Sequence, residues 1–93
     1  MVIGAARVEL HVHGSQSLKQ KRGVVRAISQ RVRNRFNVAV AEVGGQGTWQ
    51  SVVLGICTVS GDAQSARRRL EKTIDFIEDL HLAEVTGQEV EVL

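Results

Sequence analysis

The first segment of the chain, Val2 to Val12, alternates small or apolar residues with polar ones. The even-numbered positions are small or apolar: Val2, Gly4, Ala6, Val8, Leu10 and Val12. The polar residues Arg7, Glu9, His11 and His13 occupy odd-numbered positions. Because side chains of a strand point alternately to opposite faces, a period of two predicts a strand with one buried face.

Two later segments have helical spacing instead. Ser17, followed three residues later by Gln20, is a capping-box pattern that predicts a helix from about Leu18 to Arg35. Its apolar residues lie within an arc of roughly 120° at 100° per residue: Leu18, Val24, Val25, Ile28 and Val32. A second amphipathic helix follows Asp62, a good N-cap residue, and runs to about Leu80.

Three further strands complete the pattern. Residues Phe36 to Val43 and Trp49 to Val59 predict a hairpin, since the glycine-rich segment Gly44 to Gly47 between them suits a turn. The last strand is expected over Val85 to Leu93, where apolar and acidic residues alternate.

The element order is therefore βαββαβ, within one domain spanning residues 1 to 93. Right-handed crossovers fold this order into a four-stranded antiparallel sheet with both helices on one face, which is the α+β, ferredoxin-like sandwich. An alternative exchanges the last strand with a partner chain, because Gly87 weakens the pairing of that strand.

Composition narrows the class of protein. Apolar residues make up 43% and charged residues 24%, which excludes a disordered or low-complexity chain. The single cysteine, Cys57, cannot form an internal disulfide, and its apolar neighbours predict that it is buried. Because no signal peptide and no apolar run of about 20 residues is found, we expect a cytoplasmic protein without membrane contact.

Charge is distributed unevenly. Residues 1 to 41 hold eight lysines or arginines and one acid, a balance of +7, whereas residues 42 to 93 balance at −5. Such asymmetry indicates an anionic partner on one side of the molecule.

The basic residues of the first helix fall on one line. With Leu18 as zero, Lys19, Arg22, Arg26 and Arg33 lie between about 40° and 100° of the wheel, over a length of about 21 Å. Acids would suit the helix dipole better than cations in a first turn, so the arrangement favours phosphate recognition over a merely solvated face.

Lys21 is different, because its wheel angle of about 300° lies inside the apolar arc. Two roles remain open at this point: its ammonium pairs with Glu9 or Glu42, or it contacts a ligand.

A larger set of residues resembles a known family. The set comprises Gly14-Ser15, Ser17 to Arg22, Arg31, Arg33, Arg35 to Val43, and Trp49-Gln50. Together these residues are similar to the YlxP-like group of small bacterial domains of unknown function, and the similarity covers nearly the whole chain. The resemblance implies a ferredoxin-like fold, no established catalytic residue, and a gene often found beside those of translation initiation factor two and ribosome-binding factor A.

RNA recognition by base stacking on the sheet is not expected, because the central strands offer no exposed aromatic residue. Trp49, beside the hairpin turn, is a candidate for stacking on one base, although a lone tryptophan more often fills an apolar gap. His11 and His13 point the same way, but with only Glu9 nearby they predict no tight metal site. No spacing typical of an enzyme and no cofactor motif is found.

Two functions follow from these patterns. The first is a non-catalytic module that binds RNA or the ribosome, with phosphates contacted by Lys19, Lys21, Arg22, Arg26 and Arg33 and a base by Trp49. The alternative is a homodimeric regulatory or scaffold domain that binds a small anionic ligand in its cleft. The second hypothesis rests on Ile3 and Ala5, which leave an apolar patch on an otherwise polar outer sheet face.

Overall fold

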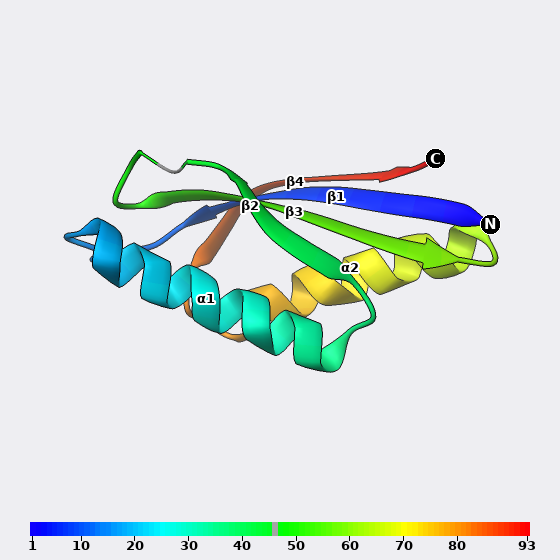
Figure 1. Ribbon diagram of the computed structural model, residues 1–93, viewed down its shortest axis with the longest axis horizontal. Helices are drawn as coiled ribbons and strands as arrows, with labels where there is room; N and C mark the ends of the chain where they lie inside the picture. Colours follow the sequence, from blue (N-terminus) through cyan, green and yellow to red (C-terminus); the bar gives the residue numbers. More distant parts are fainter. Residues whose placement is uncertain (46) are drawn as a thin grey trace.

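A computed structural model describes residues 1–45 and 47–93 of the chain. In chain order the elements are β1 (Val2–His11), α1 (Leu18–Arg35), β2 (Ala39–Gly44), β3 (Ser51–Ser60), α2 (Ala63–Asp79) and β4 (Glu84–Val92). This order confirms the predicted βαββαβ arrangement, and the fold is a ferredoxin-like α+β sandwich. Figure 1 shows the sheet as one layer with both helices beneath it, and the two termini at the same end of the molecule.

The sheet has the strand order β2-β3-β1-β4, and every neighbouring pair is antiparallel. β4 pairs with β1 of its own chain from Gly4 opposite Val92 to His11 opposite Glu84, so the structure has the arrangement without strand exchange. The ladder contains one irregularity, between Glu9 and Leu10, close to Gly87. β2 and β4 are the edge strands.

The core lies between the sheet and the two helices. Alternate residues of β1 and β3 point toward the helices and are buried, as the period of two predicts. They meet the apolar stripes of the helices, and the buried set includes Val8, Leu10, Leu54, Ile56, Ile28, Val32, Leu70, Ile74 and Ile77. Gly4 is part of this contact, because a Cβ there would lie 2.9 Å from Leu70.

Two predicted strand starts are wrong by two or three residues. The backbone N–H of Phe36 donates to the carbonyl of Val32 at 2.9 Å and so closes α1, and β2 begins only at Ala39. The hydroxyl of Thr48 accepts from the N–H of Ser51 at 3.3 Å in the hairpin turn, so β3 begins after Trp49. The hairpin is thus shorter than the apolar pattern indicates.

The outer face of the sheet has no helix over it. The prediction that Cys57 is buried is wrong, because Thr58 and Ile56 occupy the inward positions of β3 and leave Cys57 exposed between them. The outward residues of β2 and β3 are mostly apolar, so the expectation of a largely polar outer face holds only for β4 and for the Arg7 to His11 half of β1. We call the exposed apolar surface formed by Ile3, Ala5, Ala41, Val43, Cys57 and Val59 the outer apolar patch.

Candidate nucleic-acid interface

The start of α1 is fixed by two reciprocal contacts. The hydroxyl of Ser17 accepts a hydrogen bond from the backbone N–H of Gln20 at 3.1 Å, and the side chain of Gln20 accepts one from the N–H of Gln16 at 2.7 Å. The predicted cap by Ser17 is therefore present, but Gln20 reaches back to Gln16 and not to Ser17 as a capping box requires.

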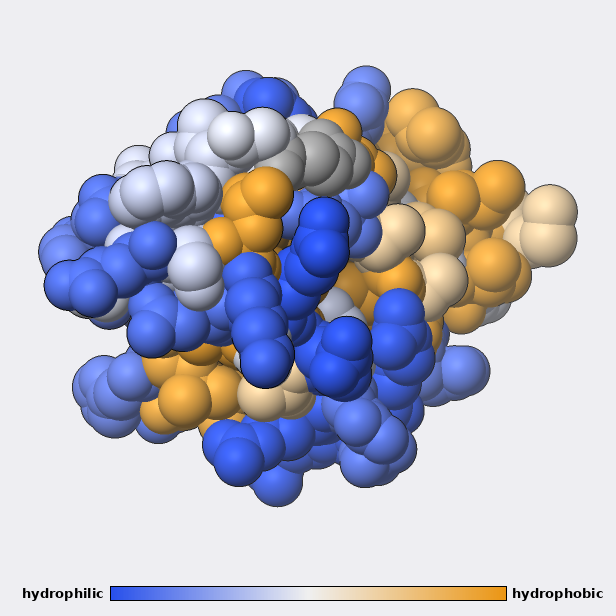
Figure 2. Space-filling model, turned by 60° about the vertical axis from the view of Figure 1, so that its left-hand side comes forward, coloured by the Kyte–Doolittle hydropathy of each residue, from blue (hydrophilic) through white to orange (hydrophobic). Residues whose placement is uncertain are grey.

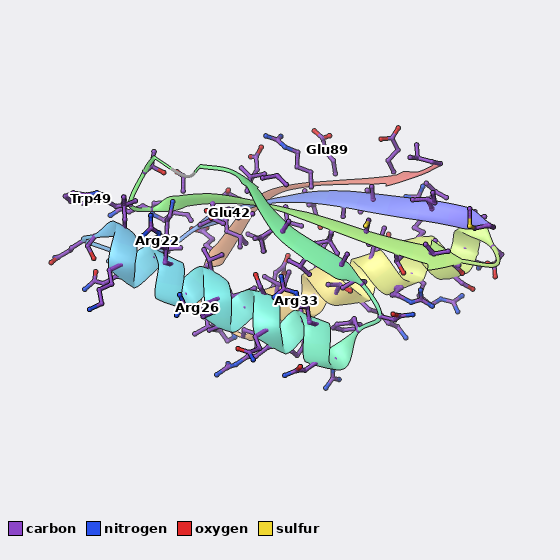
Figure 3. All side chains as sticks on the ribbon, in the orientation of Figure 1. Arg22, Arg26, Arg33, Glu42, Trp49 and Glu89 are labelled. Atoms are coloured by element: carbon purple, nitrogen blue, oxygen red, sulfur yellow. The ribbon has the colours of Figure 1, made fainter. Side chains whose placement is uncertain are left out.

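Four cations follow one side of α1, and we call them the basic stripe: Lys19, Arg22, Arg26 and Arg33. All four are exposed, and Figure 3 shows the three labelled arginines following one another along the helix. The first turn holds no acid. Across residues 1–45 and 47–93 the ion pairs are Arg7–Glu9, His13–Glu84 and Lys21–Glu42, so none neutralises the stripe.

Arg33 shows which way the stripe faces. Its guanidinium donates a hydrogen bond to the backbone carbonyl of Val40 in the edge strand β2 at 2.8 Å. The stripe therefore runs along the side of α1 that borders β2, away from α2. A guanidinium carries five N–H donors, so this bond fixes the group and leaves donors for a phosphate.

Lys21 does not belong to this surface, and its predicted contact with nucleic acid is not available. Its side chain is only 2% exposed, as its place in the apolar arc of the wheel indicated. The ammonium donates to the carbonyls of Gly45 at 2.6 Å and Ser51 at 3.3 Å, and it lies 3.8 Å from a carboxylate oxygen of Glu42. Of the two roles left open by the sequence, the structure has the pairing with Glu42.

These contacts attach the hairpin to the helix. Gly45 has a φ of +80°, and a Cβ there would lie 2.5 Å from the carbonyl oxygen of Ser51, so the turn requires glycine. Within the described part of the chain, the Glu42 oxygen nearest Lys21 is buried and accepts no hydrogen bond. Of the contacts described here, only the ammonium of Lys21 balances the negative charge of this oxygen.

Trp49 lies at the end of the hairpin and is 55% exposed, so it does not fill an apolar gap. Its neighbour Gln50 ties the hairpin to the loop before α1: the side-chain amide donates to the carbonyl of Ser15 at 3.2 Å, and the Gln50 carbonyl accepts from the N–H of Val12 at 2.8 Å. The backbone at Trp49 is thereby held close to the loop before α1, and Figure 3 shows Trp49 at the same end of the molecule as Arg22 and away from Arg33.

A second basic group was missed by sequence reasoning. Arg68, Arg69 and Lys72 of α2 line a hollow of about 220 Å³ beside Phe36. Arg35, at the end of α1, lines the neighbouring hollow together with Lys72, Asp75 and Asp79. The guanidinium of Arg35 lies 5.2 Å from the centre of the Phe76 ring. No sequence signal could have found the group, because periodicity gives each helix a face but does not say which faces meet.

The three histidines lie near one another, around the end of β1 and the start of β4. The rings of His11 and His13 lie 4.3 Å apart, and His13 contacts Glu84 at 2.7 Å beside a hollow of about 520 Å³ that His81 also lines. Glu9, the third ligand considered, pairs with Arg7 instead at 3.1 Å. The described residues contain no group of three or more metal-ligating side chains, and weak metal affinity stays a prediction.

Neither helix is long and apolar enough to span a bilayer, judged over the residues that the structure describes.

Comparison with known proteins gives a family and a fold. A family model described as "Protein of unknown function (DUF503)" matches residues 3–90. The uncharacterized protein YlxP of Bacillus subtilis (strain 168) is 39% identical over 77 residues, which are 83% of this chain and 84% of that protein. The designed protein Foldit4 superposes with a TM-score of 0.51 at 19% identity, over 99% of this chain and 94% of that one.

A weaker structural likeness is to SnoaB, a cofactor-independent oxygenase from Streptomyces nogalater. Its TM-score is 0.49 at 12% identity, over 99% of this chain and 90% of that chain. The designed protein supports the fold alone, and the oxygenase carries no argument about this chain.

Proposed function

We propose that this chain, which belongs to the family described as "Protein of unknown function (DUF503)", is a non-catalytic cytoplasmic module that binds RNA, free or within the ribosome. The observation that carries the proposal is the combination of an unneutralised basic stripe with an exposed tryptophan fixed at its end. Cations would contact successive phosphates, and the indole would stack on a base.

The place of the cations on the helix supports a ligand. The N-terminus of a helix carries a partial positive charge, so Lys19 in the first turn destabilises α1 by about 0.3–1 kcal/mol, and Arg22 in the next turn does so less. An anion held there would gain both from these side chains and from the free backbone N–H groups of the first turn. Folding stability explains Arg33, which lies in the last turn and is bonded to β2, but it does not explain Lys19 at the start of the helix, where phosphate binding supplies a reason.

The length of the stripe supports a polymer rather than a single anion. Lys19 and Arg33 are separated by about 21 Å at 1.5 Å per residue. Four cations over that length match several successive phosphates of one strand, and a small anion would contact only one or two of them.

Trp49 extends the surface from phosphates to bases. Stacking of one base on an aromatic side chain contributes about 1–3 kcal/mol and depends little on sequence. The contacts of Gln50 and Lys21 hold the hairpin in place before RNA arrives, so little ordering would accompany binding. This mode differs from recognition on a sheet face, where the strands carry the aromatic residues.

A matched pair of variants tests the proposal. In the first, Arg22→Glu and Arg26→Glu reverse two charges of the stripe; in the control, Arg31→Glu and Arg67→Glu reverse two exposed arginines that lie elsewhere. Binding to a labelled single-stranded RNA of mixed sequence is followed by fluorescence anisotropy. We expect at least about tenfold weaker binding for the stripe variant and a much smaller change for the control, since local phosphate contacts exceed the effect of net charge.

Both variants should remain folded, because exposed substitutions usually change the free energy of unfolding by no more than about 0.5 kcal/mol. Equal binding by the parent and the stripe variant would refute the proposal.

A further inference from the structure

The outer apolar patch covers neighbouring positions on three strands. The register places Cys57 of β3 between Ala39 of β2 and Ala5 of β1, and the next outward residue, Gly55, lies opposite Ala41. These small side chains form the floor of a hollow of about 310 Å³. In Figure 2 the largest apolar area lies toward the upper right of the molecule, whereas hydrophilic side chains cover most of the middle and the lower part.

Larger apolar side chains border the hollow. Ile3 and Val59 stand at one end, and Val43 stands at the other, where it packs across Gly55. Val59 is 58% exposed and Val43 is 56% exposed. Together with Ile3 they form a continuous apolar surface, and such surfaces often mark an interaction site. Contact with a second apolar surface would remove these exposed side chains from water.

We propose that the outer apolar patch is covered by a second copy of this chain, packed sheet on sheet about a two-fold axis that runs along β3. In this arrangement β3 faces β3 of the other copy, and β2 faces β1. The axis brings the two Cys57 side chains close together at the centre of the contact.

The distribution of charge agrees with this axis. Two acids of the outer face, Glu89 and Glu91, lie on β4, opposite Arg7 and Ala5 of β1. With β3 on the axis, β4 of each copy lies outside the contact, so these carboxylates stay in water. Arg7 and Glu9, at the border of the patch, neutralise each other at 3.1 Å. A partner of opposite charge would require a charged patch, which this surface lacks at its centre.

The area of the face fits a reversible dimer. β1, β2 and β3 contribute 10, 6 and 10 residues. At about 3.3 Å per residue and 4.8 Å between strands, they cover roughly 400 Å² per copy. Two opposed faces then cover about 800 Å², below the roughly 1,200 Å² at which stable specific interfaces begin, so the dimer belongs to the weak, transient class.

The dimer does not depend on the proposed RNA binding. α1 lies on the opposite side of the sheet, so two basic stripes would remain exposed on the two outer sides of the dimer (Figure 1). Failure of the dimer would leave the RNA proposal intact, and failure of RNA binding would leave the dimer intact.

The test measures mass and cross-linking with the full chain. Sedimentation equilibrium between about 10 and 500 µM compares the parent with Val59→Lys and with the control Gln64→Lys, which adds the same charge to an exposed residue of α2. We expect the parent and the control to dimerise alike. The Val59→Lys variant should dissociate about tenfold more readily, because its ammonium would leave water without a partner.

Cys57 reports the orientation of the two copies, since it is the only cysteine of the chain. A short bifunctional maleimide should link the parent and the control into covalent dimers, and link Val59→Lys poorly. Circular dichroism checks that each variant is folded. A monomeric parent at 500 µM, or a dimer that Val59→Lys leaves unchanged, would overturn the proposal. So would a parent dimer whose two Cys57 thiols the reagent cannot join.

Discussion

Replacement of Lys21 by methionine tests how the candidate interface is held together. The ammonium of Lys21 is buried and donates to two backbone carbonyls of the hairpin, at 2.6 Å from Gly45 and 3.3 Å from Ser51. Methionine fills nearly the same volume, so the apolar packing of the stem is kept while both hydrogen bonds and the charge are removed. Any loss of stability therefore reports the polar contacts.

The size of the loss follows from these contacts. A hydrogen bond that involves a charged group contributes about 1.5–3 kcal/mol, so two give at least about 3 kcal/mol. Breaking a buried ion pair costs about 3–5 kcal/mol. The lower end applies here, because the Glu42 side chain is 25% exposed and is partly reached by water. We expect Lys21→Met to lower the free energy of unfolding by about 3 kcal/mol, or the Tm by roughly 12–24 °C for a domain of this size.

Urea unfolding followed by circular dichroism measures the change, with Lys19→Met as the matched control. Lys19 is exposed in the same helical turn, so its replacement should not lower the free energy of unfolding and should raise it by no more than about 1 kcal/mol, because it removes a cation from the start of the helix. Adding Glu42→Gln to Lys21→Met should recover part of the loss, since the unpaired charge is removed. A loss below about 1 kcal/mol for Lys21→Met, with an unchanged m-value, would show that the contacts do not hold the hairpin.

Three further predictions concern separate sites. Trp49→Ala should weaken RNA binding by about tenfold through the loss of stacking, and should leave urea unfolding nearly unchanged because the indole is exposed. Dialysed protein should hold no stoichiometric zinc or copper by elemental analysis, and metal retained at His11 and His13 would contradict this. Hydrogen bonds from the backbone N–H and the hydroxyl of Ser65 hold the pKa of Asp62 below its usual value of 3.8. The stabilisation is therefore complete above pH 3.8 and is lost as pH falls through the lowered pKa, and Asp62→Asn should flatten stability measured by urea over that range.

The sequence predicts the fold where local chemistry decides it. Ser17 and Gln20 predict where α1 begins, and the predicted ends of this helix, Leu18 and Arg35, are those of the structure. The ends of β2 are less predictable, because Phe36 is apolar and suits a strand but closes the helix through its backbone N–H. Apolar pattern alone cannot distinguish these two uses of one residue.

The sequence predicts which side of a strand points outward when alternate residues are polar, but not when residues on both sides are apolar. β1 alternates with charged residues, so its outward side is evident from the sequence. In β3 apolar residues occupy both parities, and Cys57 could not be assigned to a face until pairing fixed the inward positions of Ile56 and Thr58. For the same reason the extent of the outer apolar patch was underestimated.

The basic stripe was predictable because helical period and charge together define it. The burial of Lys21 was indicated by its wheel angle, but its partners come from a hairpin 24 and 30 residues away and needed the tertiary structure. The exposure of Trp49 also depends on tertiary contacts, those that Gln50 makes with the loop before α1.

The salt dependence of RNA binding tests the central claim most directly, because it counts phosphate contacts. Four contacts from Lys19, Arg22, Arg26 and Arg33 to a single strand predict a slope of log K against log salt near −3, at about −0.7 per contact. The variant with Arg22→Glu and Arg26→Glu keeps two of these contacts and should give a slope near −1.4, again at about −0.7 for each. A parent slope near zero, or the same slope for both proteins, would contradict the account.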